Sequence, residues 1–384
     1  MQFNPMSPEF RRDPYPFYAE LRREAPVHRS DFGLWLISRY DDVVFTLKRH
    51  DLFSSTAMNM NVHDKPTRTV INTDPPVHTR MRNIVNRAFT PKMVADMEPR
   101  IREVTRELLD AVIERGEMDF VRDFAVPLPV TIIAEILGVD ASRRDDFKRW
   151  SSASVGMAPV GDERRDMQEF FAYFEEAIAE RRRPRGDLIS IVVQASEGEE
   201  PLTADEVLAF TGLLLIAGNE TTTNLLGNAV YHLLRNPDQL QIAREDPSII
   251  PNVVEEALRF DSPVQFLFRR TTQDVDVAGV TIPAGSEVSP IYASANRDGR
   301  RFPDPDRFDV RRNAQGHVAF GHGVHFCLGA PLARLEARVA LEEVLGRLAG
   351  IELKGADEPE RLNSLFLRGF ASLPLAFEPA TAPV

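Results

Sequence analysis

The 384-residue chain has a single cysteine, and the loop around it, residues 320–329 (FGHGVHFCLG), constrains the fold most strongly. Gly321, Gly323 and Gly329 surround Cys327, and glycines let a backbone approach a ligand closely. A helical pattern follows, so the sulfur faces the positive end of a helix dipole, which favours a thiolate. A lone cysteine is usually a small buried hydrophobe, but such a residue needs no flanking glycines. The loop therefore indicates a metal or catalytic site.

The spacing of Phe320, Gly323, His325, Cys327 and Gly329 resembles the haem-ligand loop of the cytochrome P450 family, bacterial soluble class. The resemblance implies that Cys327 ligates the iron of haem b and that His325 contacts a haem propionate. It also implies that Phe320 shields the sulfur. Backbone N–H groups near Gly329 would donate hydrogen bonds to the sulfur and tune the redox potential of the iron. Thiolate ligation favours O–O cleavage. The implied enzyme is a monooxygenase that inserts one oxygen atom of O2 into a C–H or C=C bond.

Residues 203–234 form the longest helical pattern, about eight turns, and Thr203 with Glu206 predicts a capping box at its start. The apolar middle of this helix is interrupted by the polar run 218–224 (GNETTTN). Polar groups in a core need partners, and locally broken rules tend to mark sites. A structural alternative is a polar face whose threonines bond carbonyls one turn back.

This run resembles the oxygen-activating motif of the family. The resemblance implies that Ala217 and Gly218 leave room above the iron, and that Glu220 and Thr221 pass protons to bound dioxygen. Ordered proton delivery with bulk water excluded is what such a reaction requires.

His78 and Arg82 are four residues apart and share one helix face. A solvated basic face is the alternative, but in the family this pair reaches the haem propionates, which need cationic partners when buried. Arg269 matches the arginine that pairs with a propionate, and Arg270 is the adjacent alternative. Strand alternation places only one of the two toward the haem.

The helix predicted over residues 250–260 contains Glu256 and Arg259, whose i, i+3 spacing predicts a structural ion pair. Glu255 is an alternative partner for Arg259. Most such ion pairs lie on the surface and contribute little to stability. This pair is informative because of its order and distance ahead of the cysteine loop.

Several other elements follow from periodicity. We expect helices over 13–26, 41–49 and 332–348, a strand over 34–38, and short strands within 264–288. Residues 93–182 predict helical segments with breaks near Gly116, Pro127, Gly138 and Gly161. Residues 51–73 lack a clear period and predict a long loop. Residues 151–162 predict either a hinged lid or an ordinary surface connection.

Chains of this length usually contain two or three domains. The resemblance instead implies a mainly α, triangular domain with a small β region that spans residues 1–384. We expect no separate reductase domain and a loose tail after about residue 377.

Net charge is −12, which argues against a nucleic-acid surface. The longest apolar run, 213–217, is too short to span a bilayer, and the start has no apolar stretch typical of a signal peptide. One cysteine fits a reducing compartment. We therefore expect a cytoplasmic monomer that binds neither membrane nor nucleic acid.

No flavin or nicotinamide motif is present, so electrons must come from a separate protein. The resemblance implies a ferredoxin or flavodoxin that an NAD(P)H-dependent reductase reduces. Several arginines and a lysine are expected on the cysteine side of the protein, and one interpretation is that they are scattered surface charges. The other is a basic docking patch made of Arg80, Arg87, Lys92, Arg334 and Arg338.

The substrate pocket is predicted by position and is mostly apolar, which favours a hydrophobic, medium-sized molecule such as a terpenoid, steroid, fatty acid or secondary-metabolite intermediate. Gln265 is the candidate polar anchor. The predicted pocket residues are Met58, Val70, Leu213, Ile216, Ala217, Val264, Gln265, Phe266, Phe366 and Leu367.

Two alternatives remain open. One is a haem-thiolate protein that is a peroxide-driven peroxygenase or a sensor, although a sensor does not need Glu220 and Thr221 as a proton relay. The other is a haem-free enzyme in which Cys327 is a nucleophile and a nearby histidine its base. His325 is poorly placed for that role, two residues away in an extended loop.

Overall fold

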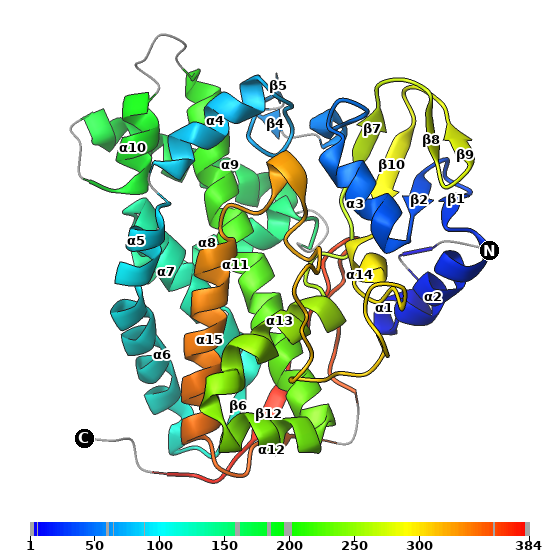
Figure 1. Ribbon diagram of the computed structural model, residues 1–384. Helices are drawn as coiled ribbons and strands as arrows, with labels where there is room; N and C mark the ends of the chain where they lie inside the picture. Colours follow the sequence, from blue (N-terminus) through cyan, green and yellow to red (C-terminus); the bar gives the residue numbers. More distant parts are fainter. Residues whose placement is uncertain are drawn as a thin grey trace.

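Helices make up most of the protein, and a small β region lies to one side of them (Figure 1). The structure is a computed structural model that describes residues 4–5, 7–58, 61–63, 65–87, 89–157, 162–182, 186–195, 202–355 and 358–380. The predicted mainly α architecture is confirmed. The α-helices are α1 (Pro8–Arg12), α2 (Tyr15–Glu24), α3 (Tyr40–Lys48), α4 (Val77–Asn86), α5 (Pro91–Asp96), α6 (Glu98–Ile113), α7 (Pro127–Leu137), α8 (Arg144–Ser154), α9 (Glu163–Ala179), α10 (Leu188–Ala195), α11 (Ala204–Arg235), α12 (Pro237–Glu245), α13 (Ile250–Phe260), α14 (Tyr292–Ala295) and α15 (Ala330–Arg347).

Helix α11 runs through the middle of the helical part (Figure 1) and packs against α7, α8, α13 and α15. Its start is the predicted capping box: the Thr203 hydroxyl accepts the Glu206 N–H at 3.2 Å, and Glu206 accepts the Thr203 N–H at 2.9 Å. At 1.5 Å per residue the helix is about 48 Å long. One straight element therefore connects the core of the protein to the candidate site.

The largest sheet has the strand order β1-β2-β10-β7-β3. Strands β2 and β10 pair in parallel, and the other neighbours are antiparallel. The predicted strands within 34–38 and 264–288 are confirmed. The strands are β1 (Val27–Arg29), β2 (Trp35–Ile37), β3 (Phe53–Ser54), β4 (Asn61–Val62), β5 (Lys65–Pro66), β6 (Glu117–Asp119), β7 (Arg269–Thr271), β8 (Val275–Val277), β9 (Val280–Ile282), β10 (Glu287–Pro290), β11 (Glu352–Leu353) and β12 (Pro374–Ala376).

Segment 51–73 contains more regular structure than the predicted loop. Strand β3 joins the large sheet, a 3-10 turn follows at Ser55–Ala57, and β4 pairs with β5. Strands of two residues are too short to leave a period in the sequence, which is why the prediction missed β3, β4 and β5.

Two predicted helix breaks have different structural roles. Pro127 does not end a helix: it starts α7, directly after a π-helix at Val121–Ala125. Gly138 does end α7, in the left-handed conformation with φ 76°. Gly161 lies outside the described residues, as does most of the predicted lid after residue 157. The first part of that lid, up to Ser154, belongs to α8, where Ser151 is buried.

The chain end is held in place as far as Ala380. Backbone N–H groups of Glu378 and Ala380 donate to Ala349 and Ile113 at 2.8 and 3.2 Å. Of the tail that the sequence predicts to be loose, residues 381–384 lie outside the described part. Within the described ranges, no helix is both long and apolar enough to cross a membrane.

Candidate active site

The cysteine loop is held by tight turns on both sides of Cys327. A 3-10 turn at Gly323–His325 precedes it, and the Cys327 N–H donates to the Phe320 carbonyl at 2.9 Å. Gly323 has φ 70°, and a Cβ there would lie 2.6 Å from the Leu47 carbonyl oxygen. Only glycine fits this position, because a side chain would clash with the backbone of α3.

The sulfur of Cys327 lies at the start of α15, as the sequence predicts. Burial raises the pKa of this thiol, whereas backbone N–H groups of Gly329 and Ala330 and the charge of Arg82 lower it. The N–H groups at the start of α15 act in the predicted direction and favour the thiolate, but burial outweighs them. A thiolate here needs a further positive partner in the cavity, as a bound metal ion would be.

Basic side chains from three separate segments converge beside this cysteine. His78 and Arg82 project from α4, Arg269 from β7, and His325 from the cysteine loop. The His78 and His325 rings lie 4.2 Å apart between centroids. Burial and then Arg82 lower the pKa of His78 to about 4, and burial and then Arg269 lower that of His325 to about 3. Both imidazoles are therefore neutral at pH 7.

Several of these groups lack partners. His78 is 2% exposed, yet neither of its ring nitrogens has a hydrogen-bond partner. No ion pair joins His78, Arg82 or Arg269 to a carboxylate in the described ranges. His325 is partly satisfied by the Ser55 hydroxyl at 2.9 Å. Orphaned buried donors and unpaired arginines are rare in folded proteins, so this cluster fits a ligand with carboxylate groups, such as the two propionates of haem.

Arg269 and Arg270 point to opposite faces of β7. Arg269 is buried and lines the cavity that contains Cys327, while Arg270 is exposed and pairs with Glu287 at 3.1 Å. The Arg269 guanidinium donates to the Phe268 carbonyl at 2.7 Å. Strand alternation thus selects Arg269 for the cavity side.

The cavity itself, here termed the central cavity, lies between α11 and the cysteine loop. Thr221 lines it, and the Thr221 hydroxyl donates to the Ala217 carbonyl one turn back, at 3.0 Å. Glu220 does not line it. Its buried carboxylate accepts hydrogen bonds from Lys148 Nζ at 2.7 and 2.8 Å, on the side of α8. Neighbouring residues on a helix point about 100° apart, so the two predicted relay residues occupy different faces.

Glu336 is a cavity residue that the sequence prediction missed. It is 2% exposed on α15, lines the central cavity, and its side chain bonds Thr222 of α11. Burial raises the pKa of Glu336 to about 8, so this carboxyl is largely protonated at neutral pH. The signal was available, since Leu332, Ala333, Val339 and Ala340 place Glu336 on an apolar helix face.

Four of the predicted substrate-pocket residues line the central cavity: Val70, Leu213, Ala217 and Val264. Six do not: Met58, Ile216, Gln265, Phe266, Phe366 and Leu367. The Gln265 amide is engaged elsewhere, accepting from the Tyr18 hydroxyl at 3.2 Å and donating to the Ser262 carbonyl at 2.7 Å.

The aromatic side chains Phe266 and Phe366 pack with Tyr15 and Tyr18 in a separate apolar cluster. Further lining residues that the prediction did not include are Ile71, Val85, Phe89, Ile133, Leu214 and Leu267.

The predicted structural pair is fully buried. Arg259 Nε and Nη2 donate to the two carboxylate oxygens of Glu256 at 2.7 and 2.8 Å. Arg259 also donates to the carbonyls of Asn296 and Pro305, both at 2.9 Å. The pair therefore ties α13 to the segment that leads into the cysteine loop, while Glu255 bonds elsewhere.

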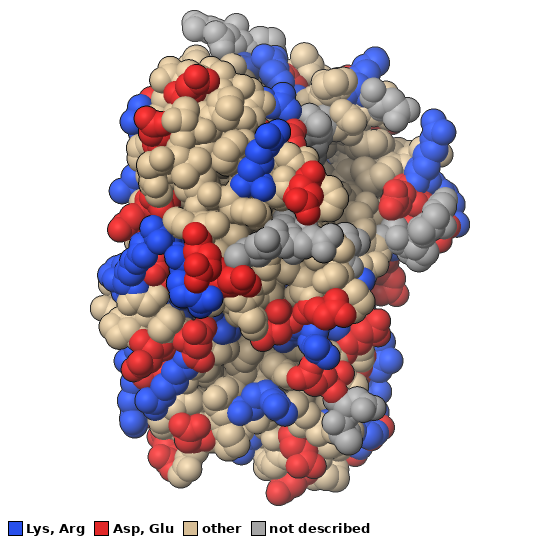
Figure 2. All heavy atoms as spheres, turned by 90° about the vertical axis from the view of Figure 1, so that its right-hand side faces the viewer, with Lys and Arg blue, Asp and Glu red and all other residues tan. Residues whose placement is uncertain are grey.

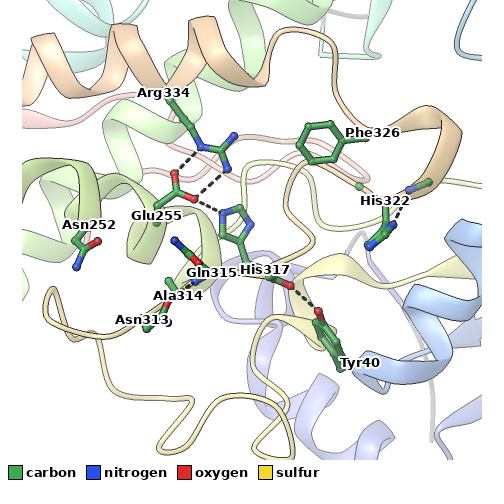
Figure 3. Close-up of a pocket in the computed structure, with 13 residues that line it drawn as sticks. Tyr40, Asn252, Glu255, Asn313, Ala314, Gln315, His317, His322, Phe326 and Arg334 are labelled. Carbon is green, nitrogen blue, oxygen red and sulfur yellow. Dashed lines mark hydrogen bonds and ion pairs between the residues drawn. The ribbon is translucent and has the colours of Figure 1, made fainter.

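A second hollow opens on the surface beside the cysteine loop (Figure 3). Glu255 accepts from Arg334 Nε at 2.6 Å and lies 3.1 Å from His317 Nε2. Burial raises the pKa of Glu255, but the bonds from His317 and Arg334 prevail and hold it at about 2. Gly321, His322 and Phe326 line both this hollow and the central cavity. One layer of the cysteine loop therefore separates the two.

Comparison with known proteins agrees with this site. The profile of the family described as Cytochrome P450 matches residues 159–377. Vitamin D(3) 25-hydroxylase of Pseudonocardia autotrophica is 42% identical over 396 residues, which cover 99% of this chain and 98% of the relative. The 6-deoxyerythronolide B hydroxylase of Saccharopolyspora erythraea is 38% identical over 395 residues, or 97% and 98% of the two chains.

Solved structures give the same result. Cytochrome P450 CYP109Q5 from Chondromyces apiculatus matches with a TM-score of 0.91 and 45% identity, covering 99% of each chain. CYP109E1 from Bacillus megaterium, solved in complex with testosterone, matches with a TM-score of 0.90 and 37% identity. It covers 97% of this chain and 100% of that one. The chain therefore belongs to the cytochrome P450 family, whose members bind haem b through a cysteine thiolate, and it is a haem-dependent monooxygenase.

Proposed function

We propose that Cys327 is the thiolate ligand of the haem iron and that His78, Arg82, Arg269 and His325 hold the haem propionates. The observation that supports this most strongly is the orphaned, buried His78 ring beside an unpaired Arg82, next to the protein's single cysteine. When bound, thiolate-ligated haem supplies the oxygen-activating chemistry. The chain supplies the ligand, the propionate partners, a dry cavity and protons.

The cysteine loop shields the sulfur from water. Phe320 and Leu328 line the cavity around Cys327, and the Arg334 guanidinium lies 4.5 Å from the centre of the Phe320 ring. Backbone N–H groups of Gly329 and Ala330 stabilise negative charge on the sulfur. Such bonds to a metal-bound thiolate tune its electron donation.

In this proposal, three residues deliver protons. The Thr221 hydroxyl lines the cavity, and its oxygen remains free to accept a proton or a water hydrogen bond. Glu220 lies on a different face of α11 and pairs with Lys148, whose side chain is 28% exposed and so reaches solvent. Rotation of Glu220 away from Lys148 would connect solvent to Thr221. Glu336, protonated beside Thr222, is a second proton source.

The electron donor is a separate protein, and the surface hollow of Figure 3 is the proposed place for its docking. Phe326 is 41% exposed at its rim and also lines the central cavity. A ferredoxin or flavodoxin seated there would approach the haem through one layer of chain.

The basic patch predicted for this docking is mostly neutralised. Arg334 pairs with Glu255, Arg338 with Glu98 and Glu342, and Lys92 with Asp96. On the face shown in Figure 2, basic and acidic side chains of the described residues are interspersed. The surface hollow and the exposed Phe326 therefore support docking at this place more than a basic patch does. A monomeric state and a cytoplasmic location stay predictions from the sequence.

Labelled oxygen separates this function from the peroxygenase and sensor alternatives. The holoprotein, supplied with ferredoxin, reductase, NADPH and 18O2, is expected to place one labelled atom in the product of a hydrophobic substrate. Turnover supported by hydrogen peroxide but not by the electron-transfer proteins would favour a peroxygenase. Absence of turnover under both conditions, across a broad panel of hydrophobic compounds, would favour a sensor.

A further inference from the structure

Arg82, Arg269 and Glu336 line the central cavity, but the described lining residues on segment 61–73 and on α11 up to Thr221, with the apolar residues grouped with them below, are uncharged. We call this uncharged part of the cavity the substrate chamber. Phe89 is its one aromatic residue, and the rest are aliphatic apart from Thr221 and Gly218. The chamber is lined by Val70, Ile71, Val85, Phe89, Ile133, Leu213, Leu214, Ala217, Gly218, Thr221, Val264 and Leu267.

The substrate chamber also lacks a free hydrogen-bond donor on its described side chains. Thr221 is the polar side chain there, and its hydroxyl hydrogen is engaged by the Ala217 carbonyl at 3.0 Å. Its oxygen lone pairs remain available. A substrate hydroxyl can therefore donate to Thr221, whereas a carboxylate or ketone oxygen finds no side-chain donor.

The charged residues nearest the chamber are already occupied. Arg82 and Arg269 belong to the proposed propionate site, and Glu220 is paired with Lys148. Arg68, two residues before Val70, does not line the cavity and pairs with the buried Glu206 at 2.7 Å. Glu336 bonds Thr222 and is largely protonated at neutral pH. An organic anion bound in the chamber would displace one of these pairs or remain unpaired.

Hydrogen bonds within the loop hold the segment that contains Val70 and Ile71. The Asn72 side chain accepts the Thr69 N–H at 2.6 Å and donates to the Thr67 carbonyl at 2.9 Å. These bonds order the turn around Val70 and Ile71, and the Arg68 guanidinium is engaged by Glu206.

From this arrangement we infer that the chamber selects an uncharged aliphatic molecule over an organic ion of the same carbon skeleton. Any polar group that such a substrate buries near α11 is a hydrogen-bond donor, such as a hydroxyl. This inference rests on the proposed function, because the haem must occupy Arg82 and Arg269. It excludes the fatty-acid carboxylates that the apolar lining alone would allow.

Three ligands of equal chain length test the inference: decan-1-ol, decanoate and decyltrimethylammonium, a cation that has no lone pair with which to bind iron. Their binding to the holoprotein is measured by calorimetry and by the haem absorption shift. Burying an unpaired charge is unfavourable, so at pH 7, where Glu336 is largely protonated, both ions should bind at least about 30-fold more weakly than the alcohol. Equal or tighter binding of decanoate, or no binding of the alcohol up to its solubility limit, would overturn the inference.

The pH dependence sharpens this test. If only the neutral acid enters, the apparent affinity for decanoate should rise about tenfold between pH 7 and pH 6, because the neutral fraction rises tenfold. Binding of decan-1-ol should stay constant and serves as the internal control. An affinity for decanoate that does not change with pH would contradict the inference.

A charge placed in the chamber should reverse the preference. Ile71→Arg should bind decanoate at least about tenfold more tightly than the unmodified protein. Phe32→Arg adds the same charge at a 75% exposed position and should change nothing. Leu213→Lys replaces the first variant if it fails to fold. No gain in either chamber variant, or an equal gain in Phe32→Arg, would refute the inference. A protein without a thiolate-haem spectrum would instead refute the proposed function.

Discussion

The rings of His78 and His325 lie 4.2 Å apart, although one comes from α4 and the other from the cysteine loop nearly 250 residues later. Both have a pKa far below 6.5, because both are buried and both feel the charge of Arg82. Bringing two histidines and two arginines together without a carboxylate partner is unfavourable unless a ligand supplies the missing acceptors. This cluster is the most specific feature that favours haem propionates at this position.

Removing a propionate partner should loosen the haem. Arg82→Leu and His78→Phe each remove a hydrogen bond to a charged group, worth about 1.5–3 kcal/mol. Haem transfer to excess apomyoglobin, followed by absorbance, should therefore be roughly 10- to 100-fold faster in each variant. Arg270→Leu removes an exposed arginine from β7, next to Arg269, and should leave the rate unchanged. An effect as large in Arg270→Leu would place the propionates elsewhere.

Glu336 should make the stability of the protein fall as pH rises. The folded state holds the Glu336 proton to about pH 8, while the unfolded chain releases it near pH 4.5. Between these values the folded state binds more protons, so the free energy of unfolding decreases with increasing pH, by at most ~1.4 kcal/mol per unit. Glu336→Gln lacks this dependence and should gain on the order of 2–4 kcal/mol over the unmodified protein between pH 5 and pH 8.

Urea denaturation at pH 5, 6.5 and 8 measures this difference. Glu287→Gln, at an exposed position, is the matched control and should track the unmodified protein at every pH. Parallel curves for Glu336→Gln and the unmodified protein would show that Glu336 is ionised in the folded state.

The Lys148–Glu220 pair should show strong coupling in a double-mutant cycle. Lys148→Met leaves the buried Glu220 without its partner and should lower the free energy of unfolding by about 1–3 kcal/mol. Glu220→Gln added to that variant removes the unpaired charge and should restore at least half of the loss. Additive effects of the two substitutions would mean that the pair contributes nothing to the fold.

Gly323→Ala should disrupt the cysteine loop for two reasons. The new methyl group would meet the Leu47 carbonyl at 2.6 Å, and φ 70° is unfavourable for alanine. Gly279→Ala isolates the second effect, because Gly279 has φ 81° and a Cβ added there would have nothing within 4 Å. We expect about 1 kcal/mol of destabilisation from Gly279→Ala and at least about 2 kcal/mol more from Gly323→Ala. Equal melting temperatures would contradict the close approach of α3.

Long periodic elements were predictable from the sequence. The helix at 250–260 was placed at its observed bounds, and α11 was placed within one residue at each end together with its capping box. Their apolar periodicity and start signals act locally, so tertiary packing does not alter them. Strands β3, β4 and β5 were missed, because two residues leave no period and their pairing depends on distant partners.

The direction of individual side chains was less predictable. Gln265 and Phe266 follow Val264 in the sequence, yet only Val264 lines the central cavity. Glu220 and Thr221 are neighbours, but the helix turns the carboxylate toward Lys148 of α8. The sequence places Glu336 on an apolar helix face, but it does not identify the partner, Thr222, which is more than a hundred residues away. In each case the side-chain environment depends on an element that local pattern does not identify.

The most direct test of thiolate ligation is the absorption spectrum of the purified holoprotein after reduction under carbon monoxide. We expect a strongly red-shifted Soret band that disappears in Cys327→Ala. Leu365→Ala, at an exposed position outside the cavity lining, should keep the band. A carbon monoxide band typical of imidazole ligation, or an unchanged band in Cys327→Ala, would show that Cys327 is not the ligand and would contradict the proposed site.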